Sequence, residues 1–224
     1  MCIDEFQQLA ALPDWKSLEG KMRSEWQLQH NTTYCLYGSK RHMMMDIFGN
    51  SNNPFYRFGQ VLFLKKISKE YWIPYIVEGF SKTGKHISDE MAEKICDTVQ
   101  CHSWYVQQLS FFIWSDSDGE VTDDIFQRQF QLLLDTNAAM FMRDTESLTP
   151  AQINMLAAIS NGETLLSSKA VVERYHLGNM QTITRNKQRL QDLGLVELTG
   201  GKLVFVDAVF ERWFRLQYHR RISI

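Results

Sequence analysis

The order of short helical and extended segments after residue 147 constrains the fold of this chain more than any other feature. The expected elements are helices over 150–159, 168–175 and 180–193, strands over 195–198 and 203–206, and a last helix over 207–218. Pro150 suits the first turn of a helix, and Gly200 with Gly201 suits the tight turn of a hairpin. The pattern therefore predicts a small helical domain that carries one β-hairpin.

Three short helices followed by a hairpin are the elements of a winged helix-turn-helix domain, whose third helix enters the major groove of DNA in many proteins. Side chains that suit phosphates and base edges occur on this helix and at the hairpin turn: Thr182, Thr184, Arg185, Lys187, Arg189 and Lys202. Residues 147–224 carry 10 Lys and Arg against 6 Asp and Glu, a net charge of +4. This modest charge favours DNA as a partner and leaves contact with a protein, or an intramolecular clamp, as the alternative.

A helical segment precedes this domain. Its expected helices are 69–81, 88–99, 103–115 and 122–141, followed by a polar linker over 143–147. Ser88 is expected to cap the second of these helices, with Asp89 and Glu90 in its first turn.

The first 66 residues indicate an incomplete α/β sheet. Strands are expected at 1–3, 32–37 and 60–64, with helices over 17–30 and 41–48 between them. Alternating strands and helices are typical of a parallel sheet. The whole sequence thus predicts a mixed α/β fold that is mostly α, with an α/β part (1–66), a helical part (67–146) and the winged helix (147–224).

Asp4 and Glu5, directly after the first apolar run, are the main chemical signal in the sequence. In P-loop ATPases such a pair does two jobs: the Asp holds Mg²⁺, usually through water, and the Glu polarises the attacking water. Two acids near a terminus are more often simply solvated. Here, however, the next strand stops at Gly38 and Ser39, where such ATPases place a polar sensor of the γ-phosphate.

Four stretches in this order resemble the archaeal-type AAA+/STAND family of P-loop ATPases: Cys2 to Gln7, Lys21 to Gln27, Tyr37 to Arg41 and Pro54 to Arg57. The resemblance covers essentially the whole chain and implies a RecA-like core, a helical lid and a C-terminal winged helix. It implies that Asp4 and Glu5 form the Walker B pair and that Ser39 stands at the sensor-1 position. It further implies a phosphate or lid contact for Arg57. The stretch from Cys101 to Leu109 resembles a lid motif, which makes His102 a candidate nucleotide contact.

The departure from the family is the phosphate-binding loop. No Gly-x-x-x-x-Gly-Lys-Ser/Thr occurs in the 224 residues, so the backbone cradle and lysine that hold the phosphates are missing. We expect the chain to be the C-terminal part of a longer ATPase, unable to hydrolyse ATP by itself. ATP and Mg²⁺, with Asp4 as the metal residue, are expected in the full-length protein, and no cofactor is expected on this chain.

The family's usual strand order, 5-1-4-3-2, leaves the strand expected at 60–64 without a neighbour. Unpaired apolar strands are templates for association, so we expect residues 1–65 to be rearranged, partly disordered or paired with a second copy in a homodimer.

Other partners and sites are limited by composition. No apolar run of about 18 residues is present, so no membrane-spanning helix is expected. There is no signal-peptide pattern, which together with four cysteines indicates free thiols in a cytoplasmic protein. The main hypothesis is the lid and winged helix of a switch-like ATPase. The alternatives are a non-enzymatic winged-helix DNA-binding regulator and a protein-interaction module.

Overall fold

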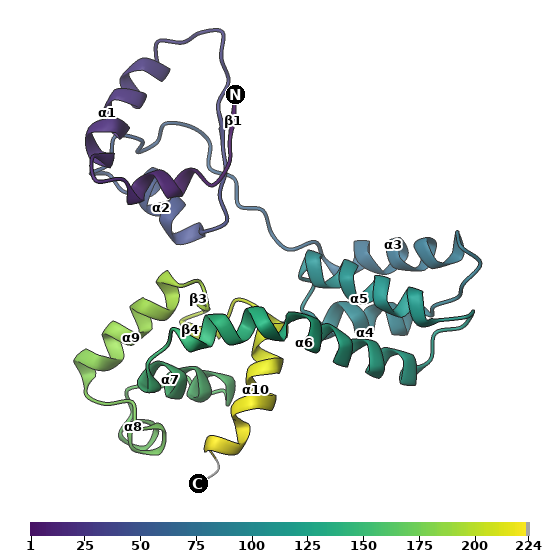
Figure 1. Cartoon of the computed structure of the whole chain (residues 1–224). Coiled ribbons are helices and arrows are strands. Elements are labelled where there is room, and N and C mark those ends of the chain that lie inside the picture. Colours follow the sequence, from purple (N-terminus) through teal and green to yellow (C-terminus); the bar gives the residue numbers. More distant parts are fainter. Residues whose placement is uncertain (223–224) are drawn as a thin grey trace. The chain divides into compact units, whose positions relative to one another are not determined.

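The protein divides into two compact units, Met1–Leu64 and Lys65–Ile224. The structure is a computed structural model that describes residues 1–222, and it is mostly helical with a few short strands (Figure 1). The expected fold class, mixed α/β and mostly α, is confirmed. Among the described residues, no helix combines the length and the apolar character needed to cross a membrane.

The N-terminal unit contains two strands and three helical elements. In chain order these are β1 (Cys2–Ile3), the 3-10 helix η1 (Phe6–Ala11), α1 (Trp15–Trp26), β2 (Cys35–Leu36) and α2 (Arg41–Gly49). The strands β1 and β2 are parallel, with Cys2 opposite Cys35 and Ile3 opposite Leu36. The expected parallel pairing is therefore present, although each strand is only two residues long.

Aromatic side chains form the core of this unit. Phe6 is fully buried, and its ring centre lies 5.9 Å from that of Trp15 and 5.6 Å from that of Phe55. The turn of η1 brings Phe6 to this position directly after β1, and Ile47 of α2 closes the cluster. One charged side chain, Glu19 of α1, is fully buried beside these rings.

The prediction of a strand over 60–64 is wrong. These residues are outside any strand or helix, and Leu64 is 97% exposed. A strand needs a hydrogen-bonded neighbour, and residues 60–64 have none in the N-terminal unit. The strand expected over 32–37 is shortened to β2 for a similar reason, because only Cys35 and Leu36 are paired in register with β1.

The second unit begins with four helices, which we call the four-helix segment: α3 (Lys69–Ser81), α4 (Asp89–Thr98), α5 (Ser103–Asp116) and α6 (Asp123–Glu146). The predicted cap of α4 is confirmed, because the backbone N–H of Met91 donates to the Ser88 hydroxyl at 3.2 Å. Thr122 caps α6 in the same way, accepting from the N–H of Ile125.

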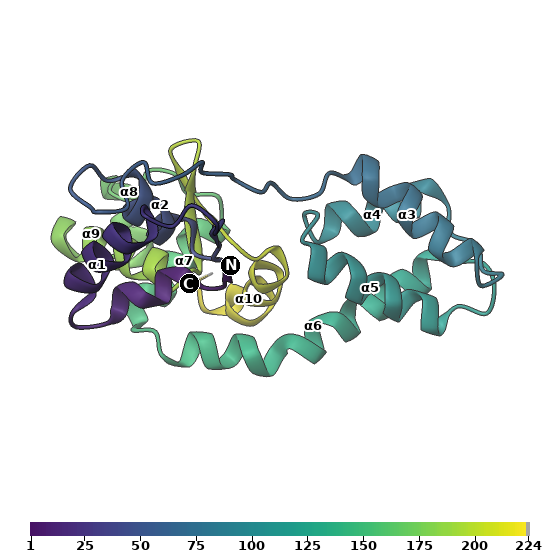
Figure 2. The same cartoon turned by 90° about the horizontal axis from the view of Figure 1, so that it is seen from above.

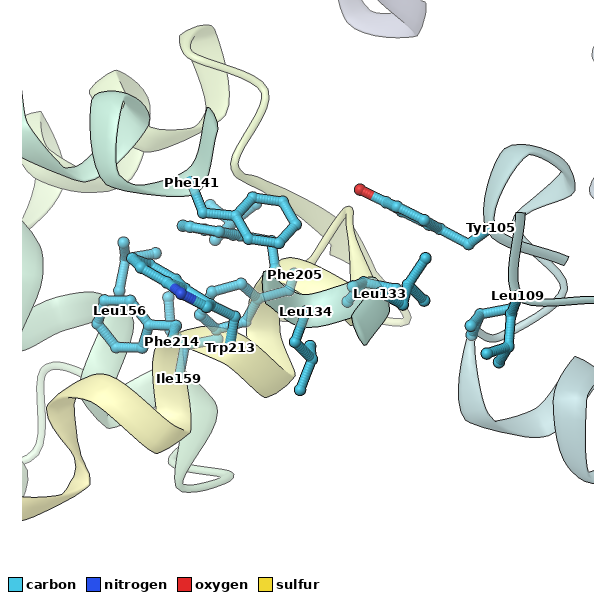
Figure 3. Close-up of a cluster of buried hydrophobic side chains, with 14 of the residues drawn as sticks. Tyr105, Leu109, Leu133, Leu134, Phe141, Leu156, Ile159, Phe205, Trp213 and Phe214 are labelled. Carbon is cyan, nitrogen blue, oxygen red and sulfur yellow. The ribbon is translucent and has the colours of Figure 1, made fainter. Parts of the chain in front are cut away.

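The helix α6 continues through the segment where a linker was expected at 143–147. It extends to Glu146, and its last turns pack against the C-terminal part of the chain. Phe141 is buried there, with its ring centre 5.4 Å from that of Phe210 and 5.6 Å from that of Trp213. Figure 3 shows Phe141, Trp213 and Phe214 gathered in this cluster. The expectation of a polar linker is therefore wrong, and α6 is shared by two parts of one continuous core.

The C-terminal segment contains the predicted three helices, hairpin and last helix. They are α7 (Pro150–Ser160), α8 (Lys169–Tyr175), α9 (Met180–Asp192), β3 (Val196–Thr199), β4 (Lys202–Phe205) and α10 (Ala208–Ile222). The hairpin is antiparallel, with Val196 opposite Phe205 and Thr199 opposite Lys202. Gly200 and Gly201 both have positive φ, the backbone conformation that a two-residue hairpin turn of this type requires.

Candidate functional site at the ends of two parallel strands

The carboxyl ends of β1 and β2 bring Glu5 and Ser39 into contact. Parallel strands end at the same edge of a sheet, where ligands of open α/β sheets commonly bind. The Ser39 hydroxyl donates to Glu5 Oε2 at 3.0 Å, and the Ser39 backbone N–H donates to Glu5 Oε1 at 3.2 Å. The structure thus joins two residues that the sequence analysis selected 34 positions apart.

Local backbone geometry fixes the direction of this carboxylate. Glu5 has φ 48°, a left-handed conformation that is costly for a residue with a Cβ. Its N–H donates to Asp4 Oδ1 at 2.7 Å. The Gln7 side-chain amide also donates to Glu5 Oε2, at 2.5 Å. Asp4 itself is exposed, whereas Glu5 is partly buried.

The hydrogen bonds keep Glu5 ionised. The Ser39 hydroxyl is the largest cause that lowers the pKa of the Glu5 carboxyl below its ordinary value, and the bond from Gln7 acts in the same direction. A carboxylate that stays charged at neutral pH is a strong hydrogen-bond acceptor for water. As an ionised acceptor it can orient a water molecule.

Gln7 and Gly38 complete the cluster, and the sequence analysis did not select either as a site residue. Gln7 is fully buried, and a Cβ on Gly38 would lie 1.8 Å from Gln7 Oε1. Only glycine therefore allows Gln7 to lie across the end of β2. We call Asp4, Glu5, Gln7, Gly38 and Ser39 the Glu5–Ser39 cluster.

A cavity of about 580 Å³ opens beside this cluster. Gly38, Ser39 and Arg41 line it together with aromatic side chains, among them Trp26 and Phe58. This size and this mixture of apolar walls with a few polar groups are typical of small-molecule sites. Residues 59–64, which follow Phe58, line it as well.

Arg57 lies apart from the cluster. Its φ is 54°, its N–H donates to the Phe48 carbonyl at 3.3 Å, and its guanidinium lies 5.1 Å from the centre of the Tyr56 ring. Within the described residues, none of its contacts is with Asp4, Glu5 or Ser39. The structure therefore does not bring the predicted phosphate contact together with the acidic pair.

His102 belongs to the second unit, where it packs at the start of α5. Its ring centre is 4.8 Å from that of Tyr105, and its Nδ1 is buried without a hydrogen-bond partner. Burial is the main cause that lowers the pKa of His102, against a smaller opposing effect of Asp207. Next to it, the Tyr105 hydroxyl donates to Asp207 at 2.6 Å, which ties α5 to the start of α10.

One stretch of the second unit comes close to the P-loop pattern but does not supply a phosphate cradle. Residues 79–86 match the P-loop pattern except that His86 replaces the Ser or Thr. The stretch starts within α3, whereas a P-loop connects a strand to the start of a helix. The Lys85 ammonium donates to the Trp114 carbonyl and lies 4.5 Å from the centre of the Trp114 ring. The Lys85 ammonium therefore contacts Trp114 of α5 within the four-helix segment.

The exposed face of α9 carries part of the predicted DNA-contact set. Thr184, Arg185 and Arg189 are exposed, as is Lys202 at the start of β4. In contrast, Thr182 is partly buried, and its methyl group lies close to Gly178. Lys187 is also partly buried.

Metal-binding capacity is limited in the described part of the chain. No group of three or more His, Cys, Asp or Glu side chains is placed to hold a metal ion there. Asp4 would therefore hold Mg²⁺ only together with ligands from water and phosphate. The residues fit the acidic half of a Mg-nucleotide site, and the phosphate-binding half is missing from them.

Comparisons with known proteins give a match in fold to a solved structure. No family model matches the sequence, and no curated protein matches it. The solved structure of the Walker-type ATPase PABY2304 of Pyrococcus abyssi is similar, with a TM-score of 0.74 and 16% sequence identity. The match covers 96% of this chain and 62% of that one, so the chain spans less than two thirds of the ATPase's length. The chain therefore has the fold of part of a Walker-type ATPase.

Proposed function

We propose that this chain is the water-activating and lid-bearing part of an AAA+/STAND-like ATPase, and that it acts with a phosphate-binding loop from outside these 224 residues. The observation that carries the proposal is the Glu5 carboxylate, held by Ser39 at the ends of two parallel strands. The likeness in fold to a Walker-type ATPase supports it. In this proposal the four-helix segment is the lid, and α7 to β4 form the winged helix.

Each residue of the cluster has a distinct task in this proposal. Glu5 orients water and accepts its proton, and Asp4 holds Mg²⁺ through water. The Ser39 hydroxyl is donated to Glu5 in the structure. A phosphate oxygen at the same edge would compete with Glu5 for that donor, so Ser39 can sense whether phosphate is present. Bound Mg-ATP would supply the reacting phosphoryl group.

Calorimetry of Mg-ATP binding tests this proposal with two proteins. The 224-residue chain is compared with a version in which a strand and phosphate-binding loop are fused ahead of Met1. We expect binding by the extended protein alone. In that protein, Glu5→Gln should retain binding and reduce hydrolysis by about 100-fold or more, because the water-orienting base is removed.

Two results would contradict the proposal. Binding of Mg-ATP to the 224-residue chain would indicate a nucleotide site of a different kind. Normal hydrolysis by the extended Glu5→Gln variant would remove Glu5 from the reaction. Glu25→Gln, which changes an exposed acid on α1, is the matched control.

A second candidate function is DNA binding by the winged helix. The observation that favours it is the pair Arg185 and Arg189, one turn apart on the exposed face of α9 and without ion-pair partners in the described structure. These side chains are free to reach phosphates or guanine edges. The competing possibility within the same segment is a protein partner on α9.

Fluorescence anisotropy with duplex DNA distinguishes these partners. We expect the double variant Arg185→Ala, Arg189→Ala to weaken binding at least tenfold and to reduce its salt dependence. Lys169→Ala, an exposed charge change on α8, is the control and should have little effect. Unchanged affinity in the double variant would exclude α9 as the DNA-reading helix.

A further inference from the structure

Two cysteines lie opposite each other beside the Glu5–Ser39 cluster. Cys2 of β1 and Cys35 of β2 are direct partners in the register of the parallel pair, and both are exposed free thiols. Neighbouring strands are about 4.8 Å apart. Disulfides join Cα atoms about 4.4–6.8 Å apart, so the spacing of the two strands falls within the range that a disulfide can bridge.

The two thiols lie on the same face of the sheet. Residues that are direct partners in register point to the same face of a sheet, and Cys2 and Cys35 are such partners. The pKa of the nearby Tyr37 hydroxyl is raised above its ordinary value. Asp4 is the main cause that raises its pKa, and Cys2 and Cys35 both contribute in the same direction. Asp4, Cys2 and Cys35 therefore lie close enough to the Tyr37 hydroxyl to act on its pKa.

The other two cysteines provide an internal comparison. Cys96 is fully buried, and burial is the main cause that raises the pKa of its thiol to about 11. Its neighbour Cys101 is partly buried. Since the thiolate is the reactive form, Cys96 is poorly suited to attack an oxidant. Exposure therefore makes Cys2 and Cys35 the more reactive of the two cysteine pairs.

We propose that Cys2 and Cys35 form a reversible disulfide that fastens β1 to β2 next to the Glu5–Ser39 cluster. The oxidant is a small-molecule disulfide of the glutathione class. One cysteine thiolate attacks it, forms a mixed disulfide and releases one small thiolate. The second cysteine thiolate then attacks the protein sulfur of the mixed disulfide, which forms the Cys2–Cys35 bond and releases a second small thiolate. The two protons from the cysteines end on the two released thiols, and a reducing dithiol reverses the reaction.

The bond would close the chain from Cys2 to Cys35 into a loop that contains Glu5, η1 and α1. It would hold together two strands that are each only two residues long and are otherwise joined by few hydrogen bonds. Fixing β1 against β2 fixes the spacing of Glu5 from Ser39. The effect on nucleotide chemistry rests on the proposed function, whereas formation of the disulfide does not.

Redox titration of the 224-residue chain tests the disulfide itself. The protein is equilibrated in mixtures of reduced and oxidised glutathione, the remaining thiols are alkylated, and the digested protein is mapped by mass spectrometry. We expect two of the four thiols to disappear together, with a cross-linked peptide joining Cys2 to Cys35. Cys35→Ser should leave Cys2 as a mixed disulfide with glutathione, and Cys101→Ser should behave like the unchanged protein.

Three results would overturn the proposal. Separate glutathione adducts on Cys2 and Cys35 without a cross-link would show that the thiols cannot reach each other. If a cross-link between Cys96 and Cys101 formed before one between Cys2 and Cys35, exposure would not decide which cysteine pair is oxidised first. A cross-link between two chains would assign the thiols to association instead.

Hydrogen exchange, measured without any nucleotide, tests whether the disulfide restrains β1 against β2. Oxidation should slow exchange of the backbone amides of Cys35 and Tyr37, which donate to the carbonyls of Met1 and Ile3, by about tenfold or more. Cys35→Ser should show no change under the same oxidant. Equal exchange in oxidised and reduced protein would show that the disulfide does not restrain the sheet, even if it forms. Binding of Mg-ATP by the 224-residue chain, with normal disulfide formation, would count against the proposed function alone.

Discussion

The two units differ in how they hold themselves together. The N-terminal unit has four buried apolar side chains, Phe6, Trp15, Ile47 and Phe55, and buries the polar Glu19 and Gln7 with them. The second unit has one continuous apolar core that runs from Trp72 in α3 to Phe214 in α10. The smaller unit thus combines few apolar side chains with buried polar ones, of which Gln7 positions Glu5, whereas the larger one is stabilised mainly by apolar packing.

This difference predicts unequal stability. A two-stranded sheet is marginal by itself, and a unit of this size buries a smaller fraction of its surface than a larger unit does. We therefore expect the N-terminal unit to unfold before the second unit when the chain is heated. The following predictions test or refine this comparison, from the largest effect to the smallest.

The largest effect is expected for Phe55→Ala. Phe55 is fully buried, and its ring centre lies 5.1 Å from that of Phe58 and 5.6 Å from that of Phe6. Removal of a buried Phe ring costs about 3–5 kcal/mol. In calorimetry the low-temperature transition should disappear while the high-temperature one stays. Leu109→Ala, a core change in α5, should instead lower the second transition, and a joint shift of both would show that the units unfold together.

Tyr105→Phe should weaken the second unit alone. The lost bond is the one from the Tyr105 hydroxyl to Asp207, and hydrogen bonds to charged groups contribute about 1.5–3 kcal/mol. Chemical unfolding followed by tryptophan fluorescence measures the change. Tyr71→Phe, at an exposed position of α3, is the control. An unchanged midpoint in Tyr105→Phe would mean that this contact does not stabilise the junction of α5 with α10.

Gly38→Ala should disturb the N-terminal unit by about 1–3 kcal/mol, because overpacking forces side chains from their positions. The new methyl group would displace the Gln7 amide, whose bond to Glu5 would then be lost. Hydrogen exchange of the η1 amides measures the effect. Gly59→Ala, where a methyl group meets no atom within 4 Å, is the matched control. Equal exchange in the two variants would contradict the tight packing described for Gly38.

The smallest expected effect is a change in pH dependence. Burial is the main cause that raises the pKa of Glu19 above its ordinary value of 4.5. The folded state therefore binds this proton more tightly than the unfolded state, so the N-terminal unit loses stability as the pH rises from 4.5 through the folded pKa. Glu19→Gln should remove this loss, as measured by unfolding at a series of pH values. Glu25→Gln should retain the same pH dependence as the unchanged chain, and a pH dependence that persists in Glu19→Gln would assign it to another group.

The sequence predicted local structure well where the deciding interactions are local. The start of α7 is an example, because Thr149 and Gln152 form a capping box within one turn. The hairpin turn at Gly200 and Gly201 is another. In both cases residues a few positions apart determine the backbone, so a pattern in the sequence is sufficient.

Prediction failed where distant contacts decide. The continuation of α6 depends on Phe141 packing against Phe210, far along the chain, and the apolar run at 60–64 lacks the neighbour that would make it a strand. The candidate site shows the same division. Glu5 and Ser39 were found because they follow strands, but no local signal indicates that Gln7 would be buried against Gly38.

The uninterrupted helix α6 has a mechanical consequence. Figure 2 shows it extending from the helices α3 to α5 toward α7 and α10. With 24 residues it is about 36 Å long, so a tilt of about 5° at one end moves the other end by about 3 Å. A displacement of that size is enough to break a hydrogen bond. If α3 to α5 move, α6 would therefore tilt as one rigid helix and displace the C-terminal segment, without a change of structure inside α6 itself.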